Sequence, residues 1–370
     1  MSVERIHIDQ FLELAKQFPV IDVRSPGEYD HAHLPGAKSL PLFTDEERKQ
    51  VGTTYKQKSR EEAIKLGLDY FGPKMKLIVE SAESILGDSP LMTLDSRLST
   101  HDSRLVLLYC WRGGMRSAAI AWLLDLYGFK VYTLAGGYKK FRNHVLDTFR
   151  LPFQFRILGG YTGSGKTELL KSLSEKDEQI VDLEDIAKHK GSAFGNIGMP
   201  KQPTQEMFEN LLACELRKSM GSHLPLATHH LPIWLEDESQ RIGHVNIPTD
   251  LWKTMRRSPV YFLDIPFEER LSHITEEYGG LERQKVIDAI QRISEKLGGL
   301  NTKLAIQWLE SGNTVESFRI LLEYYDRFYS RSLHNREGVN SLLQSIKSKS
   351  VSAENANLLI RHVQYQHQTN

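Results

Sequence analysis

Hydrophobic residues are most concentrated in the first half of the chain at residues 105–109, where five consecutive positions carry no charge. A short, uninterrupted apolar run of this kind predicts a buried strand of a parallel sheet. Residues 118–128 then place apolar side chains at helical spacing and end in glycine, which predicts a helix. The eight residues between these two elements therefore lie where a strand ends and a helix begins.

The loop at residues 110–117 has the chemistry of an anion site. Its residues are Cys110, Trp111, Arg112, Gly113, Gly114, Met115, Arg116 and Ser117. The glycines let the backbone curl, so that its N–H groups, the helix N-terminus and Arg116 converge on one anion. The same field favours a thiolate, so we predict Cys110 and Arg116 as the catalytic residues and the other six as the anion-binding loop. The alternative is a buried cysteine beside a turn.

A further apolar run at residues 19–24 predicts another short strand. Helical spacing at residues 61–71 and 74–85 predicts a helical insertion over about residues 44–100, covering the face of the sheet that carries the loop. Lys56, Lys58 and Arg60 in this insertion could bind a polyanion, and a solvated helix surface explains each of them equally well.

The second half of the chain begins with an apolar strand at residues 155–158, followed by a glycine-rich loop and a helix at residues 168–173. The loop fits the pattern G-x-x-x-x-G-K-[ST] in its required context. Backbone N–H groups in such a loop wrap a diphosphate, the lysine adds charge, and the threonine can ligate Mg²⁺. We predict diphosphate binding, which does not by itself imply hydrolysis, by Gly160, Thr162, Gly163, Ser164, Gly165, Lys166 and Thr167.

Further apolar runs at residues 179–183, 231–235 and 259–264 predict strands that alternate with helices in a parallel sheet. None of these runs ends in an acidic residue with an evident role in nucleotide hydrolysis. Asp182, Glu184 and Glu238 are the carboxylates that could reach the phosphate site or its Mg²⁺ through water, or could instead only cap helices or form ion pairs.

Basic residues outside the two loops are candidates for RNA or phosphate contacts, each with a plain surface role as the alternative. These candidates are Lys188, His189, Lys190, Arg241, Arg256 and Arg257. The loop at residues 188–195 could clamp an RNA backbone, complete the phosphate pocket, or be a flexible surface loop.

From about residue 266 the apolar spacing becomes helical, with helices predicted at residues 267–278, 283–297, 301–311 and 315–329. Residues 341–370 are polar and are expected to fray. We therefore predict an α/β protein with a parallel-sheet domain at 1–145, a P-loop α/β domain at 150–266 and a helical region at 267–370 packed on the P-loop domain.

Composition changes this picture little. The 370 residues include 47 basic and 47 acidic side chains, so a nucleic-acid partner would need a local basic patch. The two cysteines, Cys110 and Cys214, suggest neither a disulfide framework nor a structural zinc site. No apolar signal segment or membrane span is evident, so a cytoplasmic enzyme without a membrane partner is expected.

Three motifs in residues 1–145 resemble a rhodanese domain. They are Ile-Asp-Val-Arg at 21–24 with its continuation to His-Leu-Pro-Gly-Ala at 33–37, the Cys110 loop, and the strand and Gly-Gly turn at 130–138. Rhodaneses carry sulfur or selenium on the loop cysteine. The usual loop has four residues between cysteine and arginine, whereas five separate Cys110 from Arg116. A longer loop makes a wider cradle, which suggests a phosphate-like group.

The fusion of this domain to a P-loop, with His-Lys-Gly-Ser-Ala-Phe-Gly at 189–195 and Glu-Ser-Gln-Arg-Ile-Gly at 238–243, resembles the tRNA 2-selenouridine synthase family. The resemblance implies conversion of wobble 2-thiouridine in tRNA into 2-selenouridine through an S-geranyl intermediate. It implies selenophosphate and geranyl diphosphate as substrates, no tightly bound cofactor, and an enzyme that supplies selenophosphate as partner; Mg²⁺ at Thr167 is suggested by the P-loop motif alone. The alternatives are an ATP-dependent kinase or sulfurtransferase that acts without RNA, and a phosphate-sensing protein without turnover.

Overall fold

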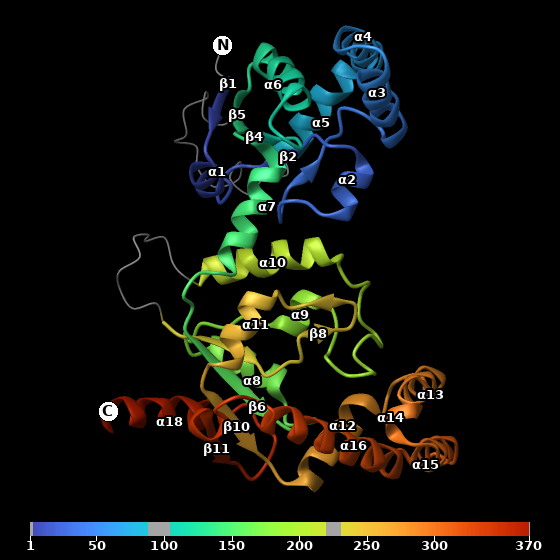
Figure 1. The fold of residues 1–370 in the computed structure, drawn as a ribbon, viewed down its shortest axis with the longest axis vertical. Helices are drawn as coiled ribbons and strands as arrows, with labels where there is room; N and C mark the ends of the chain where they lie inside the picture. The colour runs from blue at the N-terminus through green and yellow to red at the C-terminus, as the bar shows by residue number, and fades with distance from the viewer. Residues whose placement is uncertain (1–2, 88–103, 220–230, 370) are drawn as a thin grey trace. The chain divides into compact units, whose positions relative to one another are not determined.

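The computed structural model describes residues 3–87, 104–219 and 231–369. The chain divides into two compact units, Met1–Asp147 and Thr148–Asn370. Figure 1 shows the elements of each unit along the chain. The last part of the predicted insertion, after residue 87, lies outside the described residues.

The first unit is built on a five-stranded parallel sheet with the order β1-β5-β4-β2-β3. The strands are β1 Val3–Ile6, β2 Val20–Asp22, β3 Lys38–Ser39, β4 Leu105–Tyr109 and β5 Lys130–Leu134. The predicted run at residues 105–109 is the middle strand, and all five of its side chains are buried. A central parallel strand covered on both faces requires this unbroken apolar run.

Helices on the sheet of the first unit are α1 Ile8–Leu14, α2 Pro26–His31, α6 Met115–Tyr127 and α7 Gly137–Thr148. Helix α6 ends at Gly128, whose φ of +101° provides the left-handed residue that closes a helix. The predicted helix after the cysteine loop is therefore confirmed, and it begins three residues earlier than the apolar spacing indicated.

The described part of the insertion consists of α3 Asp45–Gln57, α4 Arg60–Phe71, a 3₁₀ turn at Gly72–Lys74 and α5 Met75–Gly87. Thr44 and Glu47 form a capping box that starts α3. Helix α5 packs on α6, while α3 and α4 lie side by side (Figure 1). The helices predicted at residues 61–71 and 74–85 are confirmed.

The second unit contains a four-stranded parallel sheet with the order β11-β10-β6-β7. Its strands are β6 Phe155–Gly160, β7 Ile233–Glu236, β10 Val260–Asp264 and β11 Leu343–Lys347. The parallel sheet is confirmed, but the strand predicted at residues 179–183 is wrong. Only an isolated bridge joins Ile180 to Trp234, because Asp182 accepts a hydrogen bond from the Asp185 N–H and caps a helix.

The helices of the second unit begin with α8 Lys166–Ser174, α9 Leu183–Ala187, α10 Gln205–Lys218 and α11 Thr249–Arg256, and a short hairpin joins β8 Arg241–Ile242 to β9 Val245–Asn246. The helical region then follows as predicted, except that the helix expected at 283–297 is broken at Ile293. Its helices are α12 Phe267–Tyr278, α13 Arg283–Arg292, α14 Ser294–Leu297, α15 Gly299–Glu310, α16 Thr314–His334 and α17 Val339–Leu342.

The C-terminal stretch does not fray as predicted. Strand β11 pairs with β10 at the edge of the sheet, and α18 Asn355–Thr369 packs on α8 (Figure 1). Ile346, Leu359 and Val363 are buried in the core beside this sheet. The prediction failed because a few apolar positions in a polar background are enough to bury one face of a helix.

Truncation of Leu359 should therefore destabilise the protein although it lies near the chain terminus. Leu359 is fully buried, and we expect Leu359→Ala to lower the free energy of unfolding by about 2–5 kcal/mol. Leu358, 40% exposed, is the matched control, and Leu358→Ala should cost less than about 0.5 kcal/mol. Urea unfolding followed by circular dichroism measures both, and equal effects of the two variants would contradict the packing of α18.

Candidate functional site

The cysteine loop connects the end of β4 to the start of α6, as the sequence predicted. Cys110 is 3% exposed. Its Sγ accepts a hydrogen bond from the Gly114 N–H at 3.3 Å and lies 3.2 Å from the Ser117 hydroxyl oxygen. The thiol is thus held at the N-terminus of a helix, inside a ring of loop donors.

These surroundings change the acidity of the Cys110 thiol. Burial alone would raise its pKa, but hydrogen bonds from Ser117 and from the Gly114 N–H outweigh burial. The positive charge of Arg116 acts in the same direction, and the pKa of Cys110 falls below its ordinary value. The lower pKa increases the share of Cys110 present as thiolate, which is the form in which a cysteine acts as a nucleophile.

The Gly136–Gly137 turn holds this loop in place. The Tyr138 N–H donates to the Cys110 carbonyl oxygen at 2.8 Å, and the Lys139 N–H donates to the Trp111 carbonyl oxygen at 3.0 Å. Gly137 has a φ of +58°, and a Cβ there would lie 2.3 Å from the Cys110 oxygen. No larger residue fits, so the Gly-Gly motif of the sequence is explained by its contact with the loop.

Arg116 already has a partner. Its two terminal nitrogens donate to the Glu28 carboxylate at 2.6 and 3.3 Å, and Arg48 Nε lies 3.6 Å from the same carboxylate. Burial raises the pKa of Glu28, but the bonds from Arg116 dominate and lower it. The sequence analysis assigned Arg116 to the anion alone. In the structure Arg116 is bound by Glu28, a residue 88 positions away that sequence spacing could not connect to the loop, so any anion at the loop would have to share Arg116 with this carboxylate.

The rim of the cysteine loop combines a cation with exposed apolar side chains. Trp111 is 39% exposed and Met115 is 53% exposed, and Arg112 is also exposed. The Trp111 ring lies 5.7 Å from the ring of Tyr138, measured between centroids. The side chains of Trp111, Arg112 and Met115 are accessible to a substrate approaching Cys110.

The second loop joins β6 to α8, and three of its glycines take positive φ angles that larger residues rarely adopt. Gly163 has a φ of +81°, and a Cβ there would lie 2.9 Å from the Arg270 carbonyl oxygen. Lys166 Nζ donates to the Gly160 carbonyl oxygen at 3.1 Å, across the mouth of the loop. Arg270 donates to the Thr162 carbonyl oxygen at 2.9 Å and binds Asp326 with both terminal nitrogens. Helix α12 therefore supports the loop from behind.

A carboxylate that the sequence analysis missed lies directly beside this loop. Strand β7 ends in Glu236, which is fully buried, and its Oε1 lies 3.1 Å from the Thr167 hydroxyl oxygen. The expectation that no strand ends in a suitable acidic residue is therefore wrong. The predicted strand stopped at residue 235, one residue before the carboxylate that extends it. Glu184 Oε2 lies 3.2 Å from the same hydroxyl.

The carboxylates beside the P-loop repel one another. Burial raises the pKa of Glu236 well above its ordinary value, and Glu184, Asp182 and Glu238 raise it further. Glu236 Oε2 is buried without a hydrogen-bond partner. No group of three His, Cys, Asp or Glu side chains arranged to hold a metal occurs in the described ranges. Thr167 with the free oxygen of Glu236 nevertheless fits a Mg²⁺ whose other ligands come from phosphate and water.

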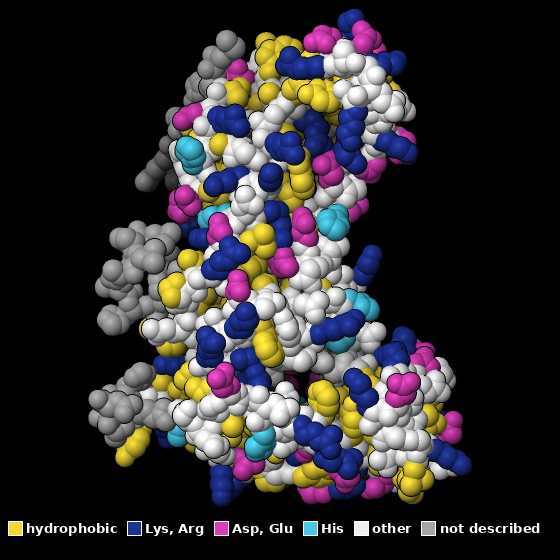
Figure 2. All heavy atoms as spheres, in the orientation of Figure 1, with side chains coloured by type: hydrophobic (Ala, Val, Ile, Leu, Met, Phe, Trp, Pro, Cys, Tyr) yellow, Lys and Arg dark blue, Asp and Glu magenta, His cyan; other side chains and the backbone are white. Residues whose placement is uncertain are grey.

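A cavity of about 370 Å³ opens above this loop; we call it the P-loop cavity. Figure 2 shows the second unit hollowed between the regions of α8 and α12. Its walls come from the P-loop, α12, α16 and the segment at residues 190–192, so the predicted loop at 188–195 does contribute to this pocket. Its polar lining residues include Ser164, Lys166, Thr167, Glu184, Lys190, Glu238 and His273.

A second, smaller recess of about 30 Å³ shares part of this wall; we call it the apolar recess. Thr162, Ser192, Ile274, Tyr278 and Tyr325 line both spaces. The residues that line only the apolar recess are Phe194, Phe318, Leu321 and Leu322. The two spaces therefore share a wall, with the P-loop on the side of the larger cavity and apolar side chains around the recess.

Of the basic residues predicted to contact RNA or phosphate, only some line the P-loop cavity. Lys190 lines the P-loop cavity and is paired with Glu277 at 2.5 Å, whereas Lys188 is paired with Asp185 and His189 is buried. Three arginines do not line the cavity and bond instead to backbone or cap a helix, namely Arg241, Arg256 and Arg257.

Comparison with known proteins matches both units. Residues 153–353 match the model of the tRNA 2-selenouridine synthase AAA domain, and residues 7–144 match that of the rhodanese-like domain. A tRNA 2-selenouridine synthase of Nitrosomonas europaea is 34% identical over 367 residues, covering 86% of this chain and 90% of the relative. The tRNA 2-selenouridine synthase of Bdellovibrio bacteriovorus is 33% identical and covers 91% of this chain and 94% of the relative. That of Hydrogenovibrio crunogenus is 36% identical and covers 87% of this chain and 91% of the relative. Among the residues described, no helix is both long and apolar enough to cross a membrane.

Proposed function

Because this chain belongs to the tRNA 2-selenouridine synthase family, we propose that it replaces the sulfur of wobble 2-thiouridine in tRNA by selenium. The two loops divide the work. The P-loop unit activates the thiocarbonyl sulfur by geranylation, and the cysteine-loop unit delivers selenium from selenophosphate. tRNA is then the macromolecular substrate, and a selenophosphate-supplying enzyme is the partner in the cytoplasm.

The observation that carries this proposal is that apolar side chains of α12 and α16 line the P-loop cavity and the apolar recess beside it. A nucleotide has a polar base and ribose behind its phosphates, whereas geranyl diphosphate has only a hydrocarbon chain. Ile274, Tyr278 and Phe328 of the larger cavity, with the recess of about 30 Å³ beside it, offer apolar surface for that chain, and burial of each methylene contributes about 0.8 kcal/mol. An anion-binding loop beside an apolar wall therefore favours a prenyl diphosphate over a nucleotide.

In the first step the thiocarbonyl sulfur attacks C1 of the geranyl group, and the C1–O bond breaks with its electron pair leaving on diphosphate. Lys166 and the N–H groups at the start of α8 stabilise that developing charge. Loss of the N3 proton leaves a neutral S-geranyl base. Mg²⁺, where it accompanies the diphosphate, would be held by Thr167 and Glu236 and would neutralise the leaving group.

In the second step the selenium of selenophosphate attacks C2 of the base, the C2–S bond breaks and geranyl thiol leaves, and water then cleaves the Se–P bond and releases phosphate. The Cys110 loop would hold the phosphate of selenophosphate; selenium carried on the Cys110 thiolate instead would need an external thiol to reduce the S–Se bond after the attack. Arg116 then contributes a positive charge that it divides between the anion and Glu28. Alkylation matters here because a thioalkyl group leaves more readily than a thiocarbonyl sulfur.

An ATP-dependent kinase or sulfurtransferase acting on a small molecule is the alternative. Glu236 favours it, since a buried carboxylate beside the P-loop threonine suits a Mg²⁺-bound polyphosphate of any kind. The apolar recess argues against it, because a nucleotide has no apolar tail to fill that space.

Mass spectrometry of tRNA nucleosides separates the two functions. We expect 2-thiouridine tRNA incubated with the protein and geranyl diphosphate to gain a geranyl adduct, and addition of selenophosphate to exchange sulfur for selenium. ATP alone should change no nucleoside. Unchanged nucleosides in all arms, together with ATP consumption in the presence of a small sulfur acceptor, would establish the alternative.

A further inference from the structure

Helix α3 of the first unit carries a row of cations that neither loop uses. Its exposed face holds Arg48, Lys49 and Lys56, and a cavity of about 450 Å³ lies along it. We call this cavity the α3 notch, and Figure 2 shows Lys and Arg side chains gathered over the region of α3. The notch is lined by Asp45, Glu46, Arg48, Lys49, Gly52, Thr53 and Lys56.

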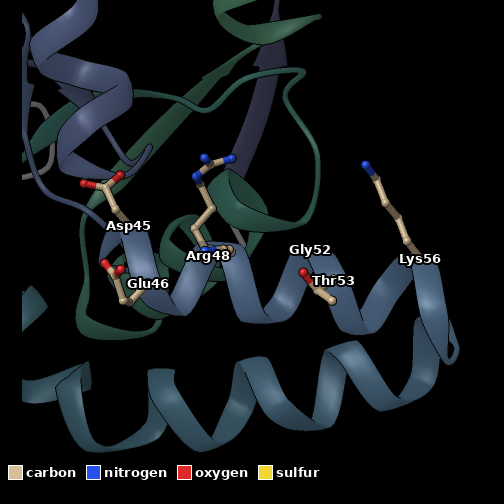
Figure 3. Close-up of a pocket in the computed structure, with 7 residues that line it drawn as sticks. Asp45, Glu46, Arg48, Gly52, Thr53 and Lys56 are labelled. Atoms are coloured by element: carbon tan, nitrogen blue, oxygen red, sulfur yellow. The ribbon is translucent and has the colours of Figure 1, made fainter.

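The shape of the notch comes from one glycine. Gly52 lies four residues from both Arg48 and Lys56, so the three positions share one face of the helix. A Cβ at Gly52 would meet no atom within 4 Å. In Figure 3 the side chains of Arg48 and Lys56 extend from the same side of α3, with Gly52 and Thr53 between them. The result is a gap about 12 Å long, at 1.5 Å per residue, with a cation at each end.

The charges in the notch are unequally compensated. Asp45 accepts a hydrogen bond from the Gly27 N–H at 3.0 Å and therefore already has a partner at the start of α2. Lys49 and Lys56 have no carboxylate within ion-pair distance among the described residues. Lys65 and Lys76 on the other helices of the insertion do have partners, Glu62 and Glu80. The notch lining thus holds the cations Lys49 and Lys56, unpaired in the described part of the chain, together with Arg48, against the two carboxylates Asp45 and Glu46.

The α3 notch is connected to the cysteine loop through Glu28. Arg48 lies 3.6 Å from the Glu28 carboxylate, and the same carboxylate binds Arg116, which lowers the pKa of Cys110. Two arginines share one carboxylate, so the net charge between notch and loop is positive. A chain of anionic groups whose end reaches Cys110 would therefore find cations along α3.

We propose that the α3 notch binds backbone phosphates of the RNA strand whose modified base is presented to Cys110. This inference rests on the proposed function and adds a docking surface for its substrate. RNA is favoured over an acidic protein because Arg48, Lys49 and Lys56 have no apolar side chains beside them in the lining, which suits a phosphate backbone more than a protein surface. Thr53 adds a hydroxyl donor for a phosphate oxygen.

Substitutions at Gly52 test the notch without removing any native contact. Gly52→Glu places a carboxylate between Arg48 and Lys56, Gly52→Gln adds the same bulk without charge, and Gly52→Ala fills only the Cβ position. All three side chains suit an exposed helix position better than glycine does, so folding should be preserved. Binding of the full chain to 2-thiouridine tRNA is measured by fluorescence anisotropy at several salt concentrations.

We expect Gly52→Glu to weaken tRNA binding about tenfold at 0.15 M salt, Gly52→Gln much less, and Gly52→Ala not at all. Lys56→Gln should reduce the slope of log K against log salt by about 1, as loss of one phosphate contact does. The matched controls Lys65→Gln and Lys76→Gln should leave the slope unchanged. In the selenation assay Gly52→Glu should raise KM for tRNA and leave kcat near its wild-type value.

The outcomes separate this inference from the proposed function. Wild-type protein that neither binds nor modifies tRNA would refute the proposed function itself. Wild-type protein that does both, with Gly52→Glu and Lys56→Gln binding tRNA as wild type does, would overturn the docking surface alone. If Gly52→Glu lowered selenation with the selenophosphate-supplying enzyme but not with free selenophosphate, the notch would serve a protein partner and the RNA proposal would be wrong.

Discussion

Replacement of Cys110 by serine should abolish selenium incorporation into tRNA and leave geranylation intact. Serine preserves the size of the side chain but cannot ionise near neutral pH, so the negatively charged carrier of selenium is lost. Because the predicted geranyl site lies in the other compact unit, its chemistry does not need the thiol. We expect selenation to fall at least about 10³-fold, as for loss of a nucleophile, with the geranyl adduct accumulating instead.

Cys214→Ser is the matched control for this experiment. Burial raises the pKa of Cys214 to about 11, so this thiol stays protonated at neutral pH and should be dispensable. Both variants are assayed by mass spectrometry of the nucleosides, with and without selenophosphate. Loss of geranylation together with selenation in Cys110→Ser, from a folded protein, would show that the two loops do not divide the work.

The rate of selenation should depend on pH, and the lowered pKa of Cys110 decides in which direction. The pKa of Cys110 is lower in the folded protein, so the folded state favours the thiolate. The contribution of this thiolate to the stability of the folded protein is present above the ordinary thiol pKa, and it is lost as the pH falls through the lowered pKa of Cys110. Selenation should accordingly fall on the acidic side, and geranylation should not follow it there.

Local sequence predicted both loops because each is defined by neighbours along the chain. The buried strand β4, the glycines of residues 113 and 114 and the helix after them all lie within about 25 residues, and the P-loop is equally contiguous. Strand and helix patterns of this kind depend on the burial of one short segment. The parallel sheets of both units followed from the same signals.

The features that prediction missed depend on contacts between distant residues. Glu28 and Arg116 are paired across 88 positions, and Glu236 and Thr167 approach across 69. The apolar recess joins Phe194 to Phe318, which no periodicity relates. Strand β11 was missed because an edge strand with one buried side chain, Ile346, has little hydrophobic pattern to detect.

Replacement of Lys166 by alanine should impair geranyl transfer, the step that Cys110→Ser is expected to leave intact. Lys166 lies across the mouth of the P-loop, where its charge would meet the diphosphate as the C1–O bond breaks. Removing one such group from a preorganised site typically costs about 10²–10³-fold in rate. We expect geranyl transfer to fall by that factor, with Lys166→Arg intermediate, because its planar guanidinium cannot replace a compact ammonium in a tight loop. Lys176→Ala, at an exposed position outside the P-loop cavity, is the matched control.

Pre-geranylated tRNA makes this prediction decisive, because it supplies the product of the impaired step. Lys166→Ala should convert that tRNA to the selenated form at the wild-type rate, since the second step needs only the cysteine loop. Cys110→Ser should fail on the same substrate. If Lys166→Ala failed on it too, the P-loop would act in both steps. If Lys166→Ala geranylated tRNA at the wild-type rate, the P-loop would have no part in the transfer, and the apolar recess beside it would need another ligand.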